Sequence, residues 1–123
     1  MSKEIKGRLI TLLEHKFYAG RDKVTFDYVF AAKMKDAGLS ITRNFRVDLE
    51  NGRKGYVDYL ITDSDGDQCA IEVDKSRPRE RSVKKLCHLE SQGIPGFVLL
   101  RYGKEPLRYS VDGVDVIRAT RFK

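Results

Sequence analysis

Two stretches near the start of the chain carry apolar residues at helical spacing. From about Lys3 to Tyr18, apolar side chains return every three or four residues, as on one face of an amphipathic helix. From about Thr25 to Ala37 a second apolar face follows, with Thr25 as the candidate N-cap and Gly38 as the stop signal. The pattern therefore predicts two helices ahead of the first strand.

The hydrophobic period then changes to two, which is typical of β-strands. Asn44 to Glu50 alternates apolar and charged residues, and Asn51-Gly52 is a strong signal for a hairpin turn. The next strand, Tyr56–Ile61, runs into a polar turn at Asp63–Asp67, and another strand covers Ala70–Lys75. We expect these three strands to form an antiparallel meander.

A helix, a buried strand and a hairpin complete the pattern. The helix is expected from Pro78 to about Gln92, since proline is favoured in the first turn. Its inward stripe has three members: Val83, Leu86 and Cys87. The apolar run Gly96–Arg101 is typical of a strand buried on both faces. Two final strands, Leu107–Ser110 and Val114–Arg118, would turn at Asp112-Gly113.

Composition narrows the class of protein. A chain of 123 residues fits one domain, residues 1–123. The 24 Lys and Arg against 18 Asp and Glu favour a polyanionic partner, nucleic acid ahead of a membrane surface. Cys69 and Cys87 lack the paired spacing of a zinc site or disulfide framework, so we expect buried thiols in a reducing compartment. With no transmembrane-length apolar run and no signal-peptide core, the expected location is the cytoplasm, without a membrane partner.

Three carboxylates interrupt the apolar strands of the expected meander. Asp58 lies in one strand, and Glu72 and Asp74 lie in the next. A carboxylate on a buried strand is costly unless it is paired or binds a metal. Because side chains alternate along a strand, Glu72 and Asp74 share a face, and Asp58 can lie opposite them. The three therefore predict a Mg²⁺ site, with a strand-end acid paired to Arg or Lys as the other interpretation.

A basic segment follows the acidic strand. Its members are Arg77, Arg79, Arg81, Lys84, Lys85 and His88. The last four share one helical face, opposite the apolar stripe, and would follow a nucleic-acid backbone. The alternative is an ordinary solvated face on which Glu80 and Glu90 form surface pairs.

The order of elements and the acidic pattern resemble the PD-(D/E)XK nuclease superfamily, which includes type II restriction enzymes, Holliday junction resolvases and many phage nucleases. The resemblance covers roughly Asn44 to Arg101. It implies an α/β fold with a restriction-endonuclease-like core, in which helices flank a mixed central sheet. Asp58 matches the first acid of the motif and Glu72 the second, whereas Asp74 stands at the position of the motif lysine.

The departure at Asp74 leaves three alternatives. Asp74 can act as a third metal-binding carboxylate beside Asp58 and Glu72. Alternatively Lys75 supplies the lysine, which requires a bulge or the end of the strand to turn its side chain toward the acids. In the third alternative the site has lost its chemistry.

The resemblance implies a metal-dependent DNA endonuclease, structure-directed and of phage or mobile-element type. Its catalytic residues would be Asp58, Glu72, Asp74 and Lys75, and the three acids would bind Mg²⁺, for which Mn²⁺ can substitute. A homodimer is expected, because so small a domain needs a partner to cut both strands. The alternatives are an inactive nuclease-fold module that binds nucleic acid and a protein-interaction domain with a basic helix.

Overall fold

The computed structural model describes residues 2–13, 23–49, 52–101 and 108–119. In this part of the chain the helices are α1 (Ser2–Leu13), α2 (Lys23–Asp36) and α3 (Glu80–Ser91). The strands are β1 (Ser40–Asp48), β2 (Lys54–Thr62), β3 (Gln68–Asp74), β4 (Gly96–Leu100), β5 (Arg108–Val111) and β6 (Val114–Arg118). The element types and their order agree with the sequence pattern.

The strands form one mixed sheet in the order β1-β2-β3-β4-β6-β5. The first three strands are antiparallel neighbours, which confirms the expected meander. β4 runs parallel to β3 and to β6, and β5 closes the sheet as the antiparallel partner of β6. All five positions of β4 are buried, as its unbroken apolar run predicted.

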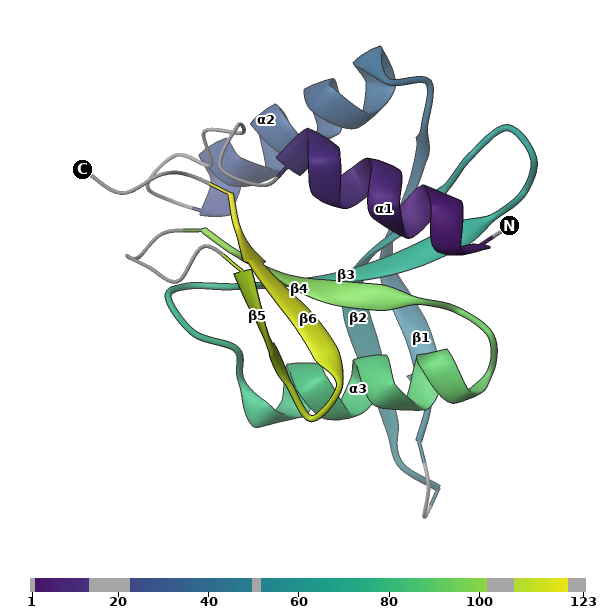
Figure 1. Ribbon diagram of the computed structural model, residues 1–123, viewed down its shortest axis with the longest axis vertical. Coiled ribbons are helices and arrows are strands. Elements are labelled where there is room, and N and C mark those ends of the chain that lie inside the picture. The colour runs from purple at the N-terminus through teal and green to yellow at the C-terminus, as the bar shows by residue number, and fades with distance from the viewer. Residues whose placement is uncertain (1, 14–22, 50–51, 102–107, 120–123) are drawn as a thin grey trace.

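Helices cover both faces of this sheet (Figure 1). α1 and α2 lie on one face, where Leu9 and Phe30 join a core with Ile71 and Leu99. α3 lies on the other face, where Leu86 packs in a second core of sheet residues. The expected fold class, α/β with a mixed sheet flanked by helices, is thus confirmed. Among the described residues, no helix combines the length and apolar character needed to cross a membrane.

Several expected boundaries differ from the structure. α1 is described as far as Leu13, so the expected extension to Tyr18 lies outside the described residues. α2 begins at Lys23, which places Thr25 inside the first turn; the N-cap prediction was wrong. α3 begins at Glu80 with an extended Arg79 as its N-cap, so Pro78 precedes the helix instead of opening it.

The inward stripe of α3 differs at one position. Its buried residues are Ser82, Val83, Leu86 and Leu89, whereas Cys87 is exposed, with Sγ 3.7 Å from the carbonyl of Asp112. Including positions 82 and 89 rotates the buried face away from position 87, because each residue turns the helix by about 100°. The buried-thiol prediction is confirmed for Cys69 and wrong for Cys87.

β1 and β2 are distorted together at Asn44 and Asp58. Asn44 has a φ of 53°, which is uncommon for a residue other than glycine. On β2 the packing changes sides at this point, because Tyr59 belongs to the core beneath α1 and α2 while Val57 belongs to the core beneath α3. Pairing of β2 with β3 also ends at Tyr59 and Ile71. The sheet therefore opens beside Asp58.

Candidate functional site

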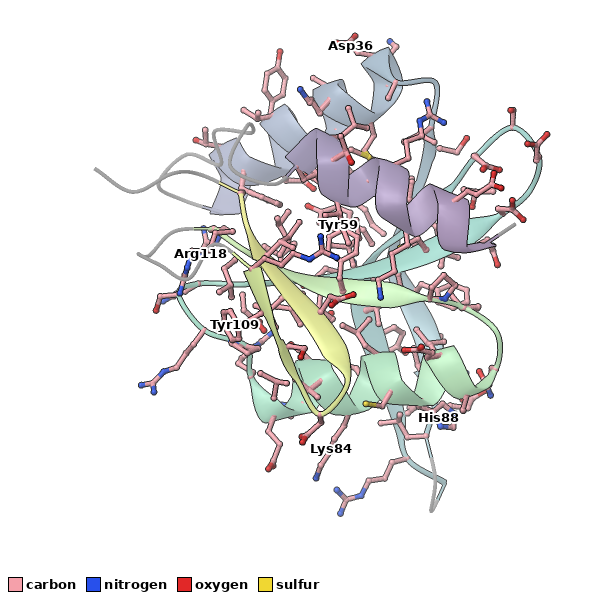
Figure 2. All side chains as sticks on the ribbon, viewed as in Figure 1. Asp36, Tyr59, Lys84, His88, Tyr109 and Arg118 are labelled. Carbon is pink, nitrogen blue, oxygen red and sulfur yellow. The ribbon has the colours of Figure 1, made fainter. Side chains whose placement is uncertain are left out.

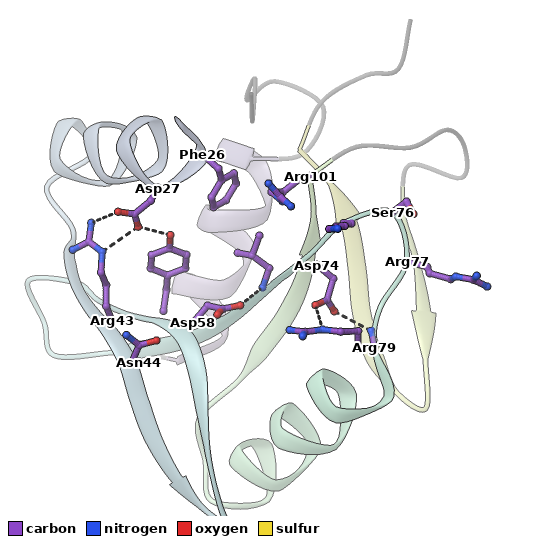
Figure 3. A pocket seen from close by; sticks show the side chains of 13 residues that line it. Phe26, Asp27, Arg43, Asn44, Asp58, Asp74, Ser76, Arg77, Arg79 and Arg101 are labelled. Carbon is purple, nitrogen blue, oxygen red and sulfur yellow. Dashed lines mark hydrogen bonds and ion pairs between the residues drawn. The ribbon is translucent and has the colours of Figure 1, made fainter. Parts of the chain in front are cut away.

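A pocket of about 620 Å³ lies beside Asp58, where β1 and β2 are distorted and the pairing of β2 with β3 ends. Its walls come from α2, β1, β2, the end of β3 with the segment after it, and Arg101 after β4 (Figure 3). Eight charged residues line it: Asp27, Asp58, Asp74, Arg43, Lys75, Arg77, Arg79 and Arg101. Two of the three predicted metal ligands, Asp58 and Asp74, therefore reach the same pocket. Three of the predicted catalytic or nucleic-acid-binding cations, Lys75, Arg77 and Arg79, line it with them.

Carboxylates of Asp58 and Glu72 bind backbone N–H groups at the point where the regular pairing of β2 with β3 ends. Asp58 Oδ2 accepts a hydrogen bond of 2.7 Å from the backbone N–H of Val73, and the N–H of Asp58 donates to Glu72 Oε1 at 2.9 Å. Regular pairing has ended one residue earlier, so these side chains satisfy backbone groups that the ladder leaves open. The described residues provide no hydrogen-bond partner for Asp58 Oδ1, and this oxygen can accept a ligand.

Glu72 lies beneath Asp58 and outside the pocket lining. It is fully buried, and its Oε2 lies 2.7 Å from Lys85 Nζ on α3. The Lys85 ammonium also donates to the carbonyl of Tyr56 at 2.7 Å. Burial raises the pKa of Glu72, and the ion pair with Lys85 opposes that rise. A direct role for Glu72 as a metal ligand stays a prediction, since both of its oxygens contact protein groups here.

Asp74 ends β3 and meets the start of α3. Its Oδ2 accepts from the backbone N–H of Arg79 at 2.9 Å, and its Oδ1 accepts from Arg79 Nε at 2.6 Å. The Asp74 side chain is only 1% exposed.

Lys75 follows the last residue of β3 and is exposed at the pocket. Alternation along the strand no longer dictates its direction there, as the strand-end alternative required. Lys75 thus shares the pocket with Asp58 and Asp74. Whether it supplies the motif lysine stays a prediction.

Not all members of the basic stripe predicted on α3 face the solvent. Arg81 and Lys84 are exposed, whereas Lys85 turns inward and keeps 13% of its side chain exposed. Gly55 provides the space, because a Cβ there would lie 3.1 Å from Lys85 Cδ. Lys85 therefore departs from the solvent-facing stripe to neutralise Glu72.

His88 is half-buried further along α3, and Figure 2 shows Lys84 and His88 on this helix. The Nε2 atom of His88 is buried and has no hydrogen-bond partner among the described residues. Neither residue lines the pocket, so the basic segment divides into a pocket part, Arg77 and Arg79, and a more distant part along the helix.

The opposite wall of the pocket holds a polar network that the sequence did not reveal. Asp27 accepts hydrogen bonds from the Tyr59 hydroxyl at 2.6 Å and from Arg43 Nε at 3.0 Å. Burial, followed by the hydrogen bond to Asp27, raises the pKa of Tyr59. Tyr59 and Asp27 are 32 positions apart on different elements, so no local pattern connects them.

A divalent cation fits this pocket on one condition. No three Asp, Glu, His or Cys side chains of the described ranges converge as a metal-binding group. Mg²⁺, however, often uses one or two carboxylates and completes its coordination with waters and substrate phosphates. Asp58 and Asp74 can supply such a pair once the Arg79 side chain leaves Asp74.

The geometry thus places three carboxylates, a lysine and several arginines around one opening in the sheet. This combination can bind a cation and an oxyanion side by side. A search of protein-family models and a search of curated protein sequences both find no match to this chain.

Proposed function

We propose that the protein is a Mg²⁺-dependent DNA endonuclease with a restriction-endonuclease-like core of the PD-(D/E)XK type. One observation carries the proposal: Asp58 and Asp74, from adjacent strands, line the same pocket as Lys75 and the arginines that follow it. The mixed sheet flanked by helices and the position of Asp58 at a distorted point of β2 support it.

The chemistry follows from the charges around the pocket. Bound Mg²⁺ would polarise the scissile phosphate and lower the pKa of the attacking water. Asp58 and Asp74 would hold the cation, and Glu72 would orient Asp58 through the hydrogen bond from the Asp58 N–H. Lys75 would stabilise the negative charge that develops on the phosphate oxygens.

DNA is the proposed substrate because the basic groups continue beyond the pocket. Arg77 and Arg81 are exposed next to it, and the chain carries a net charge of +6. Cations in this arrangement neutralise backbone phosphates irrespective of base sequence. A structure-directed activity, a homodimer and a cytoplasmic location remain predictions within this proposal.

A non-catalytic nucleic-acid-binding module is the second candidate. The ion pairs Asp74–Arg79 and Glu72–Lys85 favour it, because they occupy the carboxylates that metal binding needs. Such a module would keep its affinity for DNA without any metal and without Asp58.

The deciding experiment measures cleavage of supercoiled plasmid, linear duplex, single strand, flap and four-way junction with Mg²⁺ or Mn²⁺. We expect metal-dependent cutting by the wild type and a loss of about 100-fold or more in Asp58→Asn, since even outer-shell metal partners are worth up to that factor. Asp36→Asn is the matched control, because Asp36 is exposed at the far end of α2 (Figure 2).

The remaining outcomes separate the candidates. Binding of the panel without cutting, unchanged in Asp58→Asn, would replace the enzyme with the binding module. A protein that neither binds nor cuts DNA at low salt would overturn both nucleic-acid proposals. The protein-interaction domain would then be the remaining candidate.

A further inference from the structure

Arg79 makes the closest charged contact with a pocket carboxylate. Its Nε lies 2.6 Å from Asp74 Oδ1, within the range of a strong charge-assisted hydrogen bond. Burial of the guanidinium lowers its pKa, but Asp74, Glu72 and Asp58 together outweigh that effect and raise the pKa of Arg79. One positive group thus experiences the field of all three carboxylates.

The Arg79 side chain is free to leave this position without breaking the fold. Its side chain is 62% exposed, whereas that of Asp74 is 1% exposed. The Arg79 backbone N–H donates separately to Asp74 Oδ2 at 2.9 Å and is unaffected by a change of rotamer. Asp74 would therefore keep one partner, and its Oδ1 would become available on the pocket side.

We infer that the Arg79 guanidinium is an internal cation that competes with a divalent metal for Asp74 and is released to a nucleic-acid phosphate. The inference rests on the proposed function, since it concerns the same carboxylates. Arg79 is a positioning residue here: it holds Asp74 in the metal-free state and binds phosphate when the metal replaces it. A guanidinium suits both roles, because carboxylate and phosphate oxygens accept its fork of donors equally well.

Competition of this kind couples the two ligands. A metal that displaces Arg79 leaves an uncompensated guanidinium at the pocket, which a phosphate can then pair. Conversely, a phosphate that captures Arg79 removes the competitor of the metal. By linkage, each ligand raises the affinity for the other by the same factor.

The first test is a calorimetric titration of the whole chain with Mn²⁺ alone. We expect Arg79→Ala to bind Mn²⁺ about tenfold more tightly than the wild type, the factor that one charge-assisted hydrogen bond supplies. Arg77→Ala is the matched control, because it removes the same charge from the same pocket without a contact to Asp74. Its Mn²⁺ affinity should stay close to that of the wild type.

The second test measures binding of a labelled DNA duplex with and without Ca²⁺. Ca²⁺ should raise the DNA affinity of the wild type and of Arg77→Ala. The enhancement should be smaller in Arg79→Ala, because the bound metal can still contact phosphate there but no guanidinium is released. Thermal unfolding checks that each variant is folded. Should Arg79→Ala fail to fold, Arg79→Gln replaces it, because glutamine keeps much of the side-chain volume without the charge.

The outcomes distinguish this inference from the proposed function. Equal Mn²⁺ affinities in wild type and Arg79→Ala overturn the competition, even where the wild type cuts DNA. Equal gains in Arg77→Ala and Arg79→Ala also overturn it, since a general charge effect would then explain the gain. Absence of Mn²⁺ binding in every variant overturns the inference. The proposed nuclease activity is overturned only if the wild type cuts none of the DNA substrates.

Discussion

Glu72 and Lys85 form the most consequential residue pair away from the pocket surface. The carboxylate is fully buried and the ammonium nearly so, with 2.7 Å between Oε2 and Nζ. Removing one member of a buried pair leaves an unpaired charge, which costs more than the pair contributes. The pair also supports Asp58, because Glu72 Oε1 accepts the Asp58 N–H.

Lys85→Ala should therefore lower the free energy of unfolding by about 3 kcal/mol. Lys84→Ala, one position away, should change it by less than about 0.5 kcal/mol, since Lys84 is exposed and only 3.7 Å from an exposed Glu80. Urea denaturation of both variants measures the difference. Similar losses in the two variants would show that the buried pair carries no special weight.

Glu72 also predicts a pH dependence. Burial raises its pKa, with Lys85 opposing, so the folded protein holds this proton to higher pH than the unfolded chain, where the pKa is near 4.5. Above that pH the folded state binds more protons, and the free energy of unfolding falls as pH rises through the folded pKa. The stability of wild type minus that of Glu72→Gln should be greatest below pH 4.5 and decline toward neutrality. A difference that grows with pH would contradict the assignment.

At the scale of elements, β4 passes unusually close to its neighbours. A Cβ on Gly96 would lie 2.6 Å from the Ala70 carbonyl oxygen of β3 and 2.8 Å from Leu86 Cδ2 of α3. The contact with Ala70 involves backbone, which cannot move without disturbing the β3–β4 pairing. Glycine at this position thus allows β4 to pack closely against both β3 and α3.

Gly96→Ala should destabilise the protein by about 1–3 kcal/mol through overpacking. Gly7→Ala in α1 is the control of opposite sign: nothing lies within 4 Å of its Cβ position, and alanine should stabilise the helix by about 0.5–1 kcal/mol. Denaturation midpoints of both variants test the pair of predictions. Tolerance of alanine at Gly96 would mean that the strands separate more easily than their geometry indicates.

The elements themselves were largely predictable from sequence, and their exact faces were not. The turn at Asp112-Gly113 follows from residue chemistry, and both residues have positive φ as such a hairpin requires. The inward turn of Lys85 depends on Gly55 and Glu72, which belong to other strands. Periodicity along α3 contains no information about those neighbours, so it placed Lys85 in a solvent-facing stripe.

At the scale of the whole molecule, exposed basic residues lie on the helices of both layers. α3 and the segment before it carry exposed Arg77 and Arg81 on one side of the sheet, while α2 ends with exposed Lys35 on the other. Nucleic acid bound at the pocket would contact the first group and not the second. Phosphate contacts then determine how strongly the affinity depends on salt.

If the protein binds DNA as proposed, the logarithm of its DNA affinity should fall linearly with the logarithm of salt concentration, and Arg81→Ala should reduce the slope by about 1. Lys35→Ala, which removes the same charge from the far end of α2, should leave the slope unchanged. Fluorescence anisotropy over a salt series measures both. Equal changes of the slope in the two variants would indicate that DNA is attracted by the net charge of the protein and does not bind along a defined surface.

The sequence by itself determined the order and type of the elements and the occurrence of acids on two neighbouring strands. Periodicity, turn residues and apolar runs act over a few positions, so they can be recognised without the fold. Only the tertiary structure decided that Asp58 and Asp74 reach the pocket, that Glu72 is paired beneath it, and that Asp27 and Tyr59 form the opposite wall. Those contacts join residues far apart in the chain. Their geometry depends on the distortion of β1 and β2 and on where the pairing of β2 with β3 ends, which no local pattern encodes.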